Sequence, residues 1–177
     1  MPLPKLSEKQ VDQLAGLVSA YIAEQRAAFG KNAQLIAAEH RPQLEAFFPA
    51  DILSGVKVVR GRAPEPGFYT LARMMGIRNV PSFSDMAGIT FEDIVVHAGP
   101  LSMQLLFHEL VHAVQYKHLG LDGFAARYVR GFLSGGCYEE IPLEKQAYEL
   151  EGWFAANPAA SFSVEDHVKE RIQRNQL

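Results

Sequence analysis

The stretch His108-Glu109-Leu110-Val111-His112, written HELVH, lies inside the longer run LLFHELVHAVQYKHLG. Residues four apart share one face of a helix, so His108 and His112 project side by side and can bind one metal ion. Glu109 lies beside that face, where its carboxylate can reach a metal-bound water without being a ligand. The flanking residues are apolar, namely Leu105, Leu106, Leu110, Val111 and Val114. This pattern predicts a buried helix, in which two unpaired imidazoles would carry a desolvation cost that a metal removes.

The form H-E-x-x-H on a helix is a signature of zinc-dependent hydrolases, and it predicts a Zn²⁺ cofactor with Glu109 as the general base. The competing interpretation is a half-exposed helix that carries two histidines and a glutamate without any ligand. A catalytic zinc has three protein ligands and an open fourth position for water. The sequence should therefore supply a third ligand outside this motif.

Glu144 is the preferred third ligand. It begins a helix predicted after the glycine pair 135–136, so that helix can fold back across the first one. His118 is too close to His112 on the same helix and is rotated off its face. Glu140 is the next candidate, and the alternative role for Glu144 is a solvated carboxylate at a helix start, where the dipole favours it.

The run Glu144-Lys145-Gln146-Ala147-Tyr148 resembles the second motif of the gluzincin metallopeptidases, in which a glutamate ligand lies in a run like E-x-x-A-[D/x]. The resemblance implies a zincin-like fold, a zinc ion held by His108, His112 and Glu144, and hydrolysis of a peptide bond. The form H-E-L-x-H-x-x-Q, which includes Gln115, is also similar to a group of poorly characterised bacterial proteins regarded as metallopeptidases. Together the resemblances cover residues 90–155.

Tyr148 departs from the gluzincin pattern, because many members have there an aspartate that orients a ligand histidine. We expect Glu140 or Glu149 to do that job instead. Tyr148 is our candidate catalytic tyrosine, since a phenol near the metal can donate to the oxyanion of a tetrahedral intermediate. Tyr138 and Tyr128 are alternatives, and core packing is the other role for each of them.

Two further residues are expected to be structural. His97 ends a predicted strand before the HELVH helix, and as a lone histidine it is interpreted as structural. Cys137 follows a glycine pair, and no neighbouring residue in the sequence would activate its thiol, so we expect an inert buried side chain.

The fold class expected is α+β, with a zincin-like core over residues 51–177 and a helical hairpin over residues 1–50. Apolar positions three or four apart predict a helix over 5–29, with a capping box at Ser7 and Gln10 and an end at Gly30. The second hairpin helix is predicted over 32–48, with a kink near His40 caused by Pro42.

The predicted core begins with a strand in GVKVVR, a helical turn over 68–75 and short strand-like pieces at 82–83 and 88–90. A better strand follows in FEDIVVHAG. We expect the strand beside the HELVH helix to be a sheet edge to which an extended peptide can add. Helices are predicted over 101–119, 124–133 and 142–156, with a short one after Ser163.

Composition fits one globular domain of 177 residues with an apolar fraction of 48%. A net charge of −3 gives no nucleic-acid footprint, and the single Cys137 excludes an intramolecular disulfide. The stretch MPLPKLSEKQ lacks the apolar core of a signal peptide, and no apolar run is long enough to span a membrane. We therefore expect a cytoplasmic zinc metallopeptidase that binds a peptide or protein substrate. The alternative is a non-catalytic zinc-binding or protein-interaction module that retains the fold. The sequence does not indicate an oligomeric state.

Overall fold

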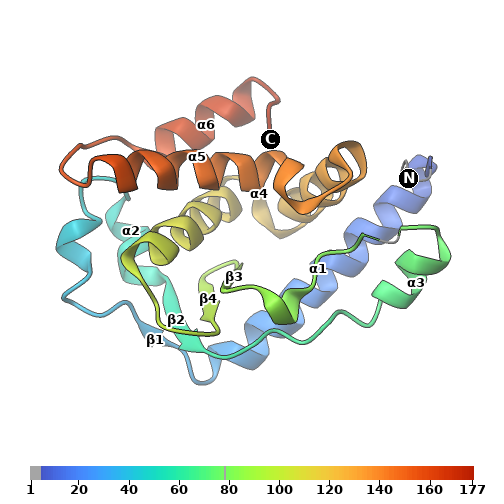
Figure 1. Ribbon diagram of the computed structural model, residues 1–177, viewed down its shortest axis with the longest axis horizontal. Coiled ribbons are helices and arrows are strands. Elements are labelled where there is room, and N and C mark those ends of the chain that lie inside the picture. Colours follow the sequence, from blue (N-terminus) through green and yellow to red (C-terminus); the bar gives the residue numbers. More distant parts are fainter. Residues whose placement is uncertain (1–4, 78) are drawn as a thin grey trace.

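The computed structural model describes residues 5–77 and 79–177, over which the chain forms six α-helices and one four-stranded sheet (Figure 1). The helices are α1 (Glu8–Gly30), α2 (Ala50–Gly55), α3 (Tyr69–Met74), α4 (Met103–Gly135), α5 (Pro142–Ala156) and α6 (Val164–Gln173). The strands are β1 (Gln34–Leu35), β2 (Lys57–Arg60), β3 (Gly88–Phe91) and β4 (Ile94–His97). Three 3₁₀ turns, η1 (Arg41–Gln43), η2 (Phe83–Asp85) and η3 (Tyr138–Glu140), complete the regular structure. The α+β prediction is confirmed. Residues 1–4, which begin both the predicted hairpin and the stretch without a signal-peptide core, lie outside the described residues.

The strands are ordered β1-β2-β4-β3 across the sheet. The central pair, β2 and β4, is parallel, whereas β1 and β3 pair antiparallel with their neighbours. β3 is therefore a sheet edge, and it lies against α4, because Thr90 of β3 donates a hydrogen bond to Glu109 of α4. The prediction of an edge strand beside the HELVH helix is confirmed.

β4 lies between two hydrophobic clusters. Val95 packs into a cluster with the first half of α4 and with α5, whereas Ile94 and Val96 pack into a second cluster with α1 and the second half of α4. A strand covered on both faces is apolar along its length instead of alternating. This explains the uninterrupted run Ile94-Val95-Val96.

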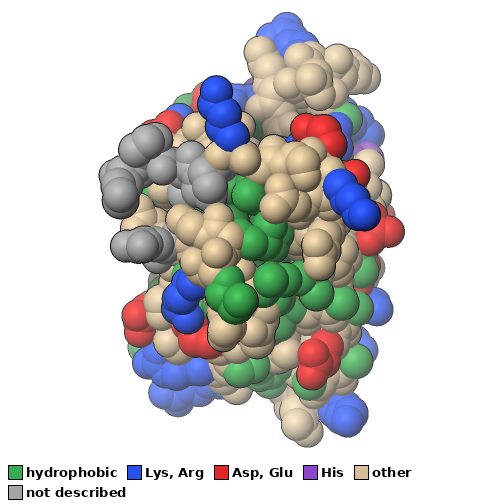
Figure 2. Space-filling model, turned by 90° about the vertical axis from the view of Figure 1, so that its right-hand side faces the viewer, with side chains coloured by type: hydrophobic (Ala, Val, Ile, Leu, Met, Phe, Trp, Pro, Cys, Tyr) green, Lys and Arg blue, Asp and Glu red, His purple; other side chains and the backbone are tan. Residues whose placement is uncertain are grey.

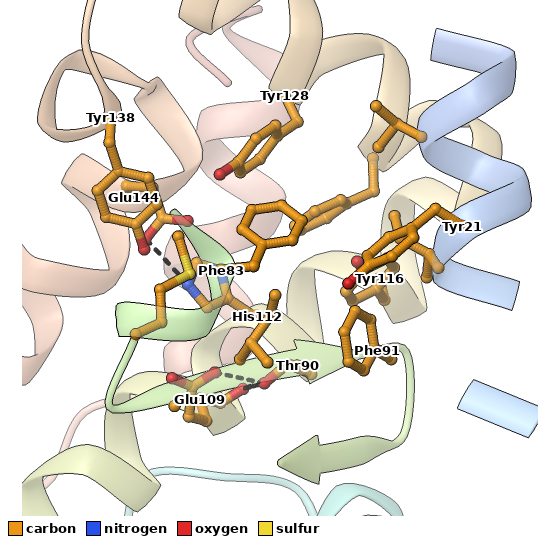
Figure 3. Close-up of a pocket in the computed structure, with 16 residues that line it drawn as sticks. Tyr21, Phe83, Thr90, Phe91, Glu109, His112, Tyr116, Tyr128, Tyr138 and Glu144 are labelled. Atoms are coloured by element: carbon orange, nitrogen blue, oxygen red, sulfur yellow. Dashed lines mark hydrogen bonds and ion pairs between the residues drawn. The ribbon is translucent and has the colours of Figure 1, made fainter. Parts of the chain in front are cut away.

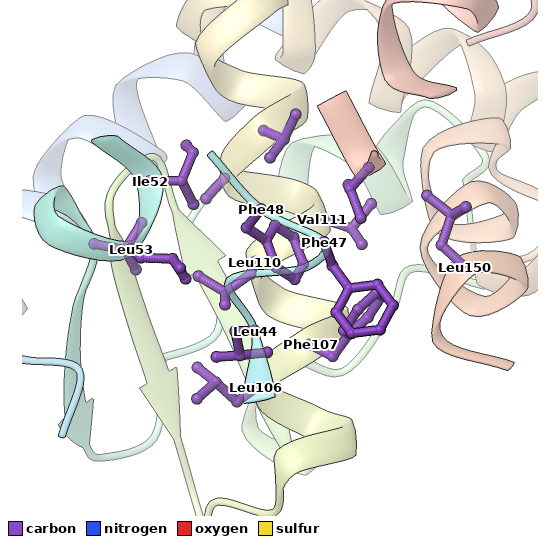
Figure 4. Packing of buried hydrophobic residues seen from close by; sticks show 14 of the residues in the cluster. Leu44, Phe47, Phe48, Ile52, Leu53, Leu106, Phe107, Leu110, Val111 and Leu150 are labelled. Carbon is purple, nitrogen blue, oxygen red and sulfur yellow. The ribbon is translucent and has the colours of Figure 1, made fainter. Parts of the chain in front are cut away.

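Apolar side chains of residues 36–53 pack against the first half of α4 (Figure 4). The ring of Phe107 stacks on Phe154 of α5, with centroids 4.5 Å apart, and meets Phe48 at 4.8 Å. Leu44 and Phe47 are buried in the same cluster. These contacts fix the rotation of α4 about its axis, so the opposite face of the helix carries the histidines.

The predicted helix over 32–48 is wrong, and with it the N-terminal hairpin of two helices. This segment contains the edge strand β1 and the turn η1, and α1 is the only α-helix that begins before residue 50 in the described part of the chain. Pro42 lacks the N–H that a helix interior needs. Leu44, Phe47 and Phe48 are buried although they lie in an irregular segment, and Leu35 of β1 is 51% exposed.

α4 contains a break at Gly120, whose φ of 68° and ψ of 171° are not helical. Glycine adopts such a positive φ without the penalty that a Cβ would bring. The two helices predicted on either side of Gly120 are the two halves of α4, which continues without an intervening loop.

The remaining local predictions have mixed outcomes. The capping boundaries at Ser7 and Ser163 are confirmed, as is the helix over 142–156. The strand-like piece at 82–83 is wrong, because Phe83 begins the 3₁₀ turn η2. No helix in the described part of the chain is long and apolar enough to cross a membrane.

Candidate metal centre

Three buried side chains from two helices converge on one point. His108 and His112 come from the first half of α4, and Glu144 comes from the first turn of α5. One ligand atom from each lies within 4.8 Å of the other two, so the group can hold a metal ion. The exposed fractions of the three residues are 5, 4 and 4%, respectively. The structure thus brings together the three residues that the sequence predicted as ligands.

The tautomer of His112 is fixed by a chain of amides that ends on backbone carbonyls. Gln115 Nε2 lies 3.0 Å from the carbonyl oxygen of Leu143, which can only accept, so the amide nitrogen must face it. Gln115 Oε1 consequently faces His112 Nδ1 at 2.8 Å, and that ring nitrogen must carry the proton. Gln146 supports this arrangement, because its Oε1 accepts from Gln115 and its Nε2 donates to the carbonyl of His167. His112 Nε2 is thereby left to face the other ligands.

His108 is oriented in the same way by Glu151. Its Nδ1 lies 2.8 Å from Glu151 Oε2, and the other carboxylate oxygen of Glu151 accepts from Gln104 at 2.6 Å. The prediction that Glu140 or Glu149 orients a ligand histidine is therefore wrong. Those two carboxylates pair instead with basic residues, Lys145 for Glu140 and Arg171 for Glu149. The pairing with Lys145 at the surface also removes Glu140 as a ligand candidate.

The three ligand atoms need positive charge between them. His108 Nε2 and His112 Nε2 are 3.2 Å apart, and Glu144 Oε2 lies 3.5 and 3.2 Å from them, respectively. Glu144 Oε2 is buried without a hydrogen bond in the described residues, although such atoms are normally paired. Two imidazole nitrogens and one carboxylate oxygen are a donor set that zinc prefers. The residues present therefore fit a metal ion.

The close approach of the two histidines and Glu144 also shifts the pKa values of these three side chains. Burial by itself lowers the pKa of His108, but the carboxylates of Glu144 and Glu151 outweigh burial and raise it to about 10. Burial likewise lowers the pKa of His112, and the negative charge of Glu144 raises it above its usual value. Burial raises the pKa of Glu144, whereas the two histidines hold it well below its usual range. In the metal-free protein a proton thus supplies the positive charge.

Zinc binding should release protons, and its affinity should fall as the pH falls. Because the pKa of His108 is raised to about 10, the metal must displace at least one proton at pH 7. The apparent affinity should drop about tenfold per pH unit for each proton displaced. Titration calorimetry in two buffers of different ionisation enthalpy measures that proton release. An affinity that stays constant from pH 8 to pH 6 would contradict this assignment.

Glu109 lies beside the ligands but is not one of them. Its Oε2 accepts a hydrogen bond of 2.7 Å from Thr90, and Figure 3 shows the pair below His112. A Cβ at Gly88 would lie 2.5 Å from Glu109 Oε1, so this strand position needs glycine for the carboxylate to fit. Burial raises the pKa of Glu109, and the charges of His112 and His108 act against that rise.

The candidate tyrosines surround the centre at different depths. Tyr148 is half-exposed, and its ring centroid is 4.6 Å from that of His108. Burial raises the pKa of its phenol, which keeps it a neutral donor. Tyr138 lines cavities on both sides of Glu109, and Tyr128 lines only the more enclosed one (Figure 3).

The other predicted bystanders lie outside the ligand group, although Cys137 was expected to be buried and is not fully so. His97 lines a separate cavity, and its Nδ1 bonds to the carbonyl of Gly99 at 2.8 Å. His118 pairs with Glu165 at 2.8 Å, away from the ligands. Cys137 is a free, half-buried thiol.

Sequence reasoning missed Glu151, Thr90 and Gly88 as supporting residues. Glu151 was detectable, because it follows Glu144 by seven residues and so returns to the same helix face. Thr90 and Gly88 left no local signal, since only the packing of β3 on α4 brings them to Glu109.

Comparisons of the chain with models of protein families, with curated proteins and with solved structures find no match in any of the three. The geometry of the centre therefore carries the functional argument.

Replacing Gln115 with methionine should weaken zinc binding by about 10- to 100-fold, because the acceptor that fixes His112 is lost. Gln146→Met should have a smaller effect, since Leu143 still holds the Gln115 amide. Competition against a chelator of known affinity measures both variants. Wild-type affinity in Gln115→Met, together with a loss of thermal stability, would mean that Gln115 only packs.

Proposed function

We propose that this protein is a zinc-dependent hydrolase with a zincin-like core, most specifically a metallopeptidase. One observation carries the proposal. The Nε2 atoms of His108 and His112 and the Oε2 of Glu144, which accepts no hydrogen bond from the described residues, meet at one buried point, with the Glu109 carboxylate next to it. Three protein ligands with a neighbouring carboxylate are typical of catalytic zinc sites.

Zinc, when bound there, would polarise a substrate carbonyl and lower the pKa of a water towards about 7. Glu109 would take a proton from the attacking water and pass it to the leaving amine. Its raised pKa suits that task, because a buried carboxylate holds a proton more readily than a solvated one. Thr90 holds Glu109 Oε2, which fixes the direction of the carboxylate.

A peptide is the substrate best supported by the neighbouring strand. Ala98 donates to the carbonyl of Ala87, and hydrogen-bonded residues alternate along an antiparallel pair. The backbone groups of Gly88 and Thr90 therefore point away from β4, toward the free edge. An extended peptide that pairs with this edge would run directly past Glu109.

Tyr148 is proposed to stabilise the oxyanion. Its neutral phenol lines the open groove that His108 and Glu109 also line. A hydrogen-bond donor that stabilises the oxyanion acts in the transition state and hardly at all in the bound substrate. Tyr148→Phe should therefore lower kcat more than it changes KM.

A non-catalytic zinc module is the rival function. Such a site is closed by a fourth protein ligand, which leaves no position for water. The ligand group has three members among the described residues, and His97 lies in another cavity. With three protein ligands a fourth position stays open for water, which favours a catalytic site over a closed one.

The test is cleavage of a proteome-derived peptide library, read by mass spectrometry. The zinc-loaded protein should produce new peptide termini, a chelator should abolish them, and added zinc should restore them. Zinc-loaded protein that cleaves no peptide in such a library, either unmodified or after N-acylation of the peptides, would contradict the proposal.

A further inference from the structure

Two cavities lie in series on the inner side of the candidate metal centre. The first has a volume of about 50 Å³, and Glu109, His112 and Glu144 form one of its walls (Figure 3). The second, of about 70 Å³, lies farther along α1 beneath α3. Val18, Phe83 and Tyr128 line both, so the cavities adjoin across these three side chains.

The surfaces of the two cavities are mainly apolar. The second is lined entirely by apolar and aromatic residues, among them Leu14, Ala72 and Ile77. Two of the tyrosines in the walls turn their hydroxyls away, because Tyr21 donates to the carbonyl of Pro64 and Tyr69 donates to that of Pro81. Their rings are what they present to an occupant.

The opposite side of Glu109 has a different character. There a wider groove of about 320 Å³ is lined by polar residues such as Gln104, Glu151 and Tyr148. The site is thus asymmetric, with a polar groove on one side and narrow apolar cavities on the other. A polar group placed in the apolar cavities would lose its hydrogen bonds to water without replacing them.

The second cavity lies on the side of the molecule that carries α3 and the first half of α1. Figure 2 faces that side, and apolar side chains gather near its centre while charged ones lie mostly toward its edges. An apolar chain that passes from the metal centre through both cavities therefore meets mainly apolar surface once it is past Glu109, His112 and Glu144.

We infer that the substrate carries a flexible aliphatic chain, longer than an amino-acid side chain, next to the scissile amide. The inference rests on the proposed hydrolase function and names its substrate class, an acylated amide or peptide. Two narrow cavities in series, which share Val18, Phe83 and Tyr128, fit a flexible chain better than a rigid ring. An ordinary side chain would fill the first cavity and leave the second without an occupant.

A series of hydroxamates tests this inference on the zinc-loaded full chain. Affinity should rise about three- to fourfold per added methylene from acetohydroxamate through butanohydroxamate to octanohydroxamate. Ala72→Leu, which narrows only the second cavity, should keep the gain up to four carbons and lose the gain beyond. Met74→Leu on the same helix is the matched control, because Met74 is 80% exposed and lines neither cavity.

A gain that stops at four carbons in the wild type, or affinity independent of length, would overturn the inference while leaving the hydrolase proposal intact. Failure of acetohydroxamate itself to bind the zinc-loaded protein would count against the hydrolase proposal instead. The cavities can then be probed without a metal, using 1-octanol. Octanol should shift the methyl resonances of Ala72 and Ile77 in the wild type, and unchanged resonances would overturn the inference.

Discussion

Glu109→Gln should lower kcat by between about a hundredfold and ten-thousandfold, the contribution usual for a general base, while the protein keeps its metal. The glutamine amide matches the carboxylate in shape and can still accept from Thr90, but it cannot take the proton of the attacking water. Both parts of this prediction are measured on the same preparation. Turnover of the best-cleaved library peptide gives the loss in kcat, and metal content after dialysis shows whether the metal is kept.

Glu139→Gln is the matched control, because Glu139 is exposed and does not belong to the ligand group. It should cleave as the wild type does. Equal turnover by wild type and Glu109→Gln would remove Glu109 from the reaction, even if the metal centre itself were real.

Glu144→Ala should abolish stoichiometric metal binding, because it removes one of three protein ligands and the charge that balances the cation. Zinc at a hundred times its dissociation constant should stabilise the wild type by about 2.7 kcal/mol and leave the variant unchanged. Thermal unfolding with and without added zinc measures the difference.

Glu140→Gln separates the two carboxylates that the sequence left in competition. Its side chain pairs with Lys145 at the surface, so the variant should bind zinc as the wild type does. Retained binding in Glu144→Ala with lost binding in Glu140→Gln would reverse the assignment of the third ligand.

The three candidate ligands were predictable because each depends on local spacing. His108 and His112 share a helix face by their separation alone, and Glu144 begins a helix whose start at Pro142 is evident in the sequence. The break at Gly120 falls between the helices predicted over 101–119 and 124–133. Its positive φ is a conformation that glycine adopts readily.

Other features depend on contacts between distant segments. The segment over 32–48 has helical periodicity, yet Ile36, Leu44, Phe47 and Phe48 are buried against α4 from irregular backbone, so packing overrides the local pattern. Likewise, the need for glycine at position 88 arises only because β3 packs on Glu109. The order of the strands cannot be read from any one of them.

Metal content tests the central claim most directly. The protein is purified, dialysed exhaustively without chelator and analysed for metals, and then analysed again after zinc is added back and the excess removed. We predict about one zinc per chain, bound by His108, His112 and Glu144. A protein that holds no metal, and takes none up when zinc is supplied, would contradict the account and leave the two histidines as ordinary residues of a buried helix.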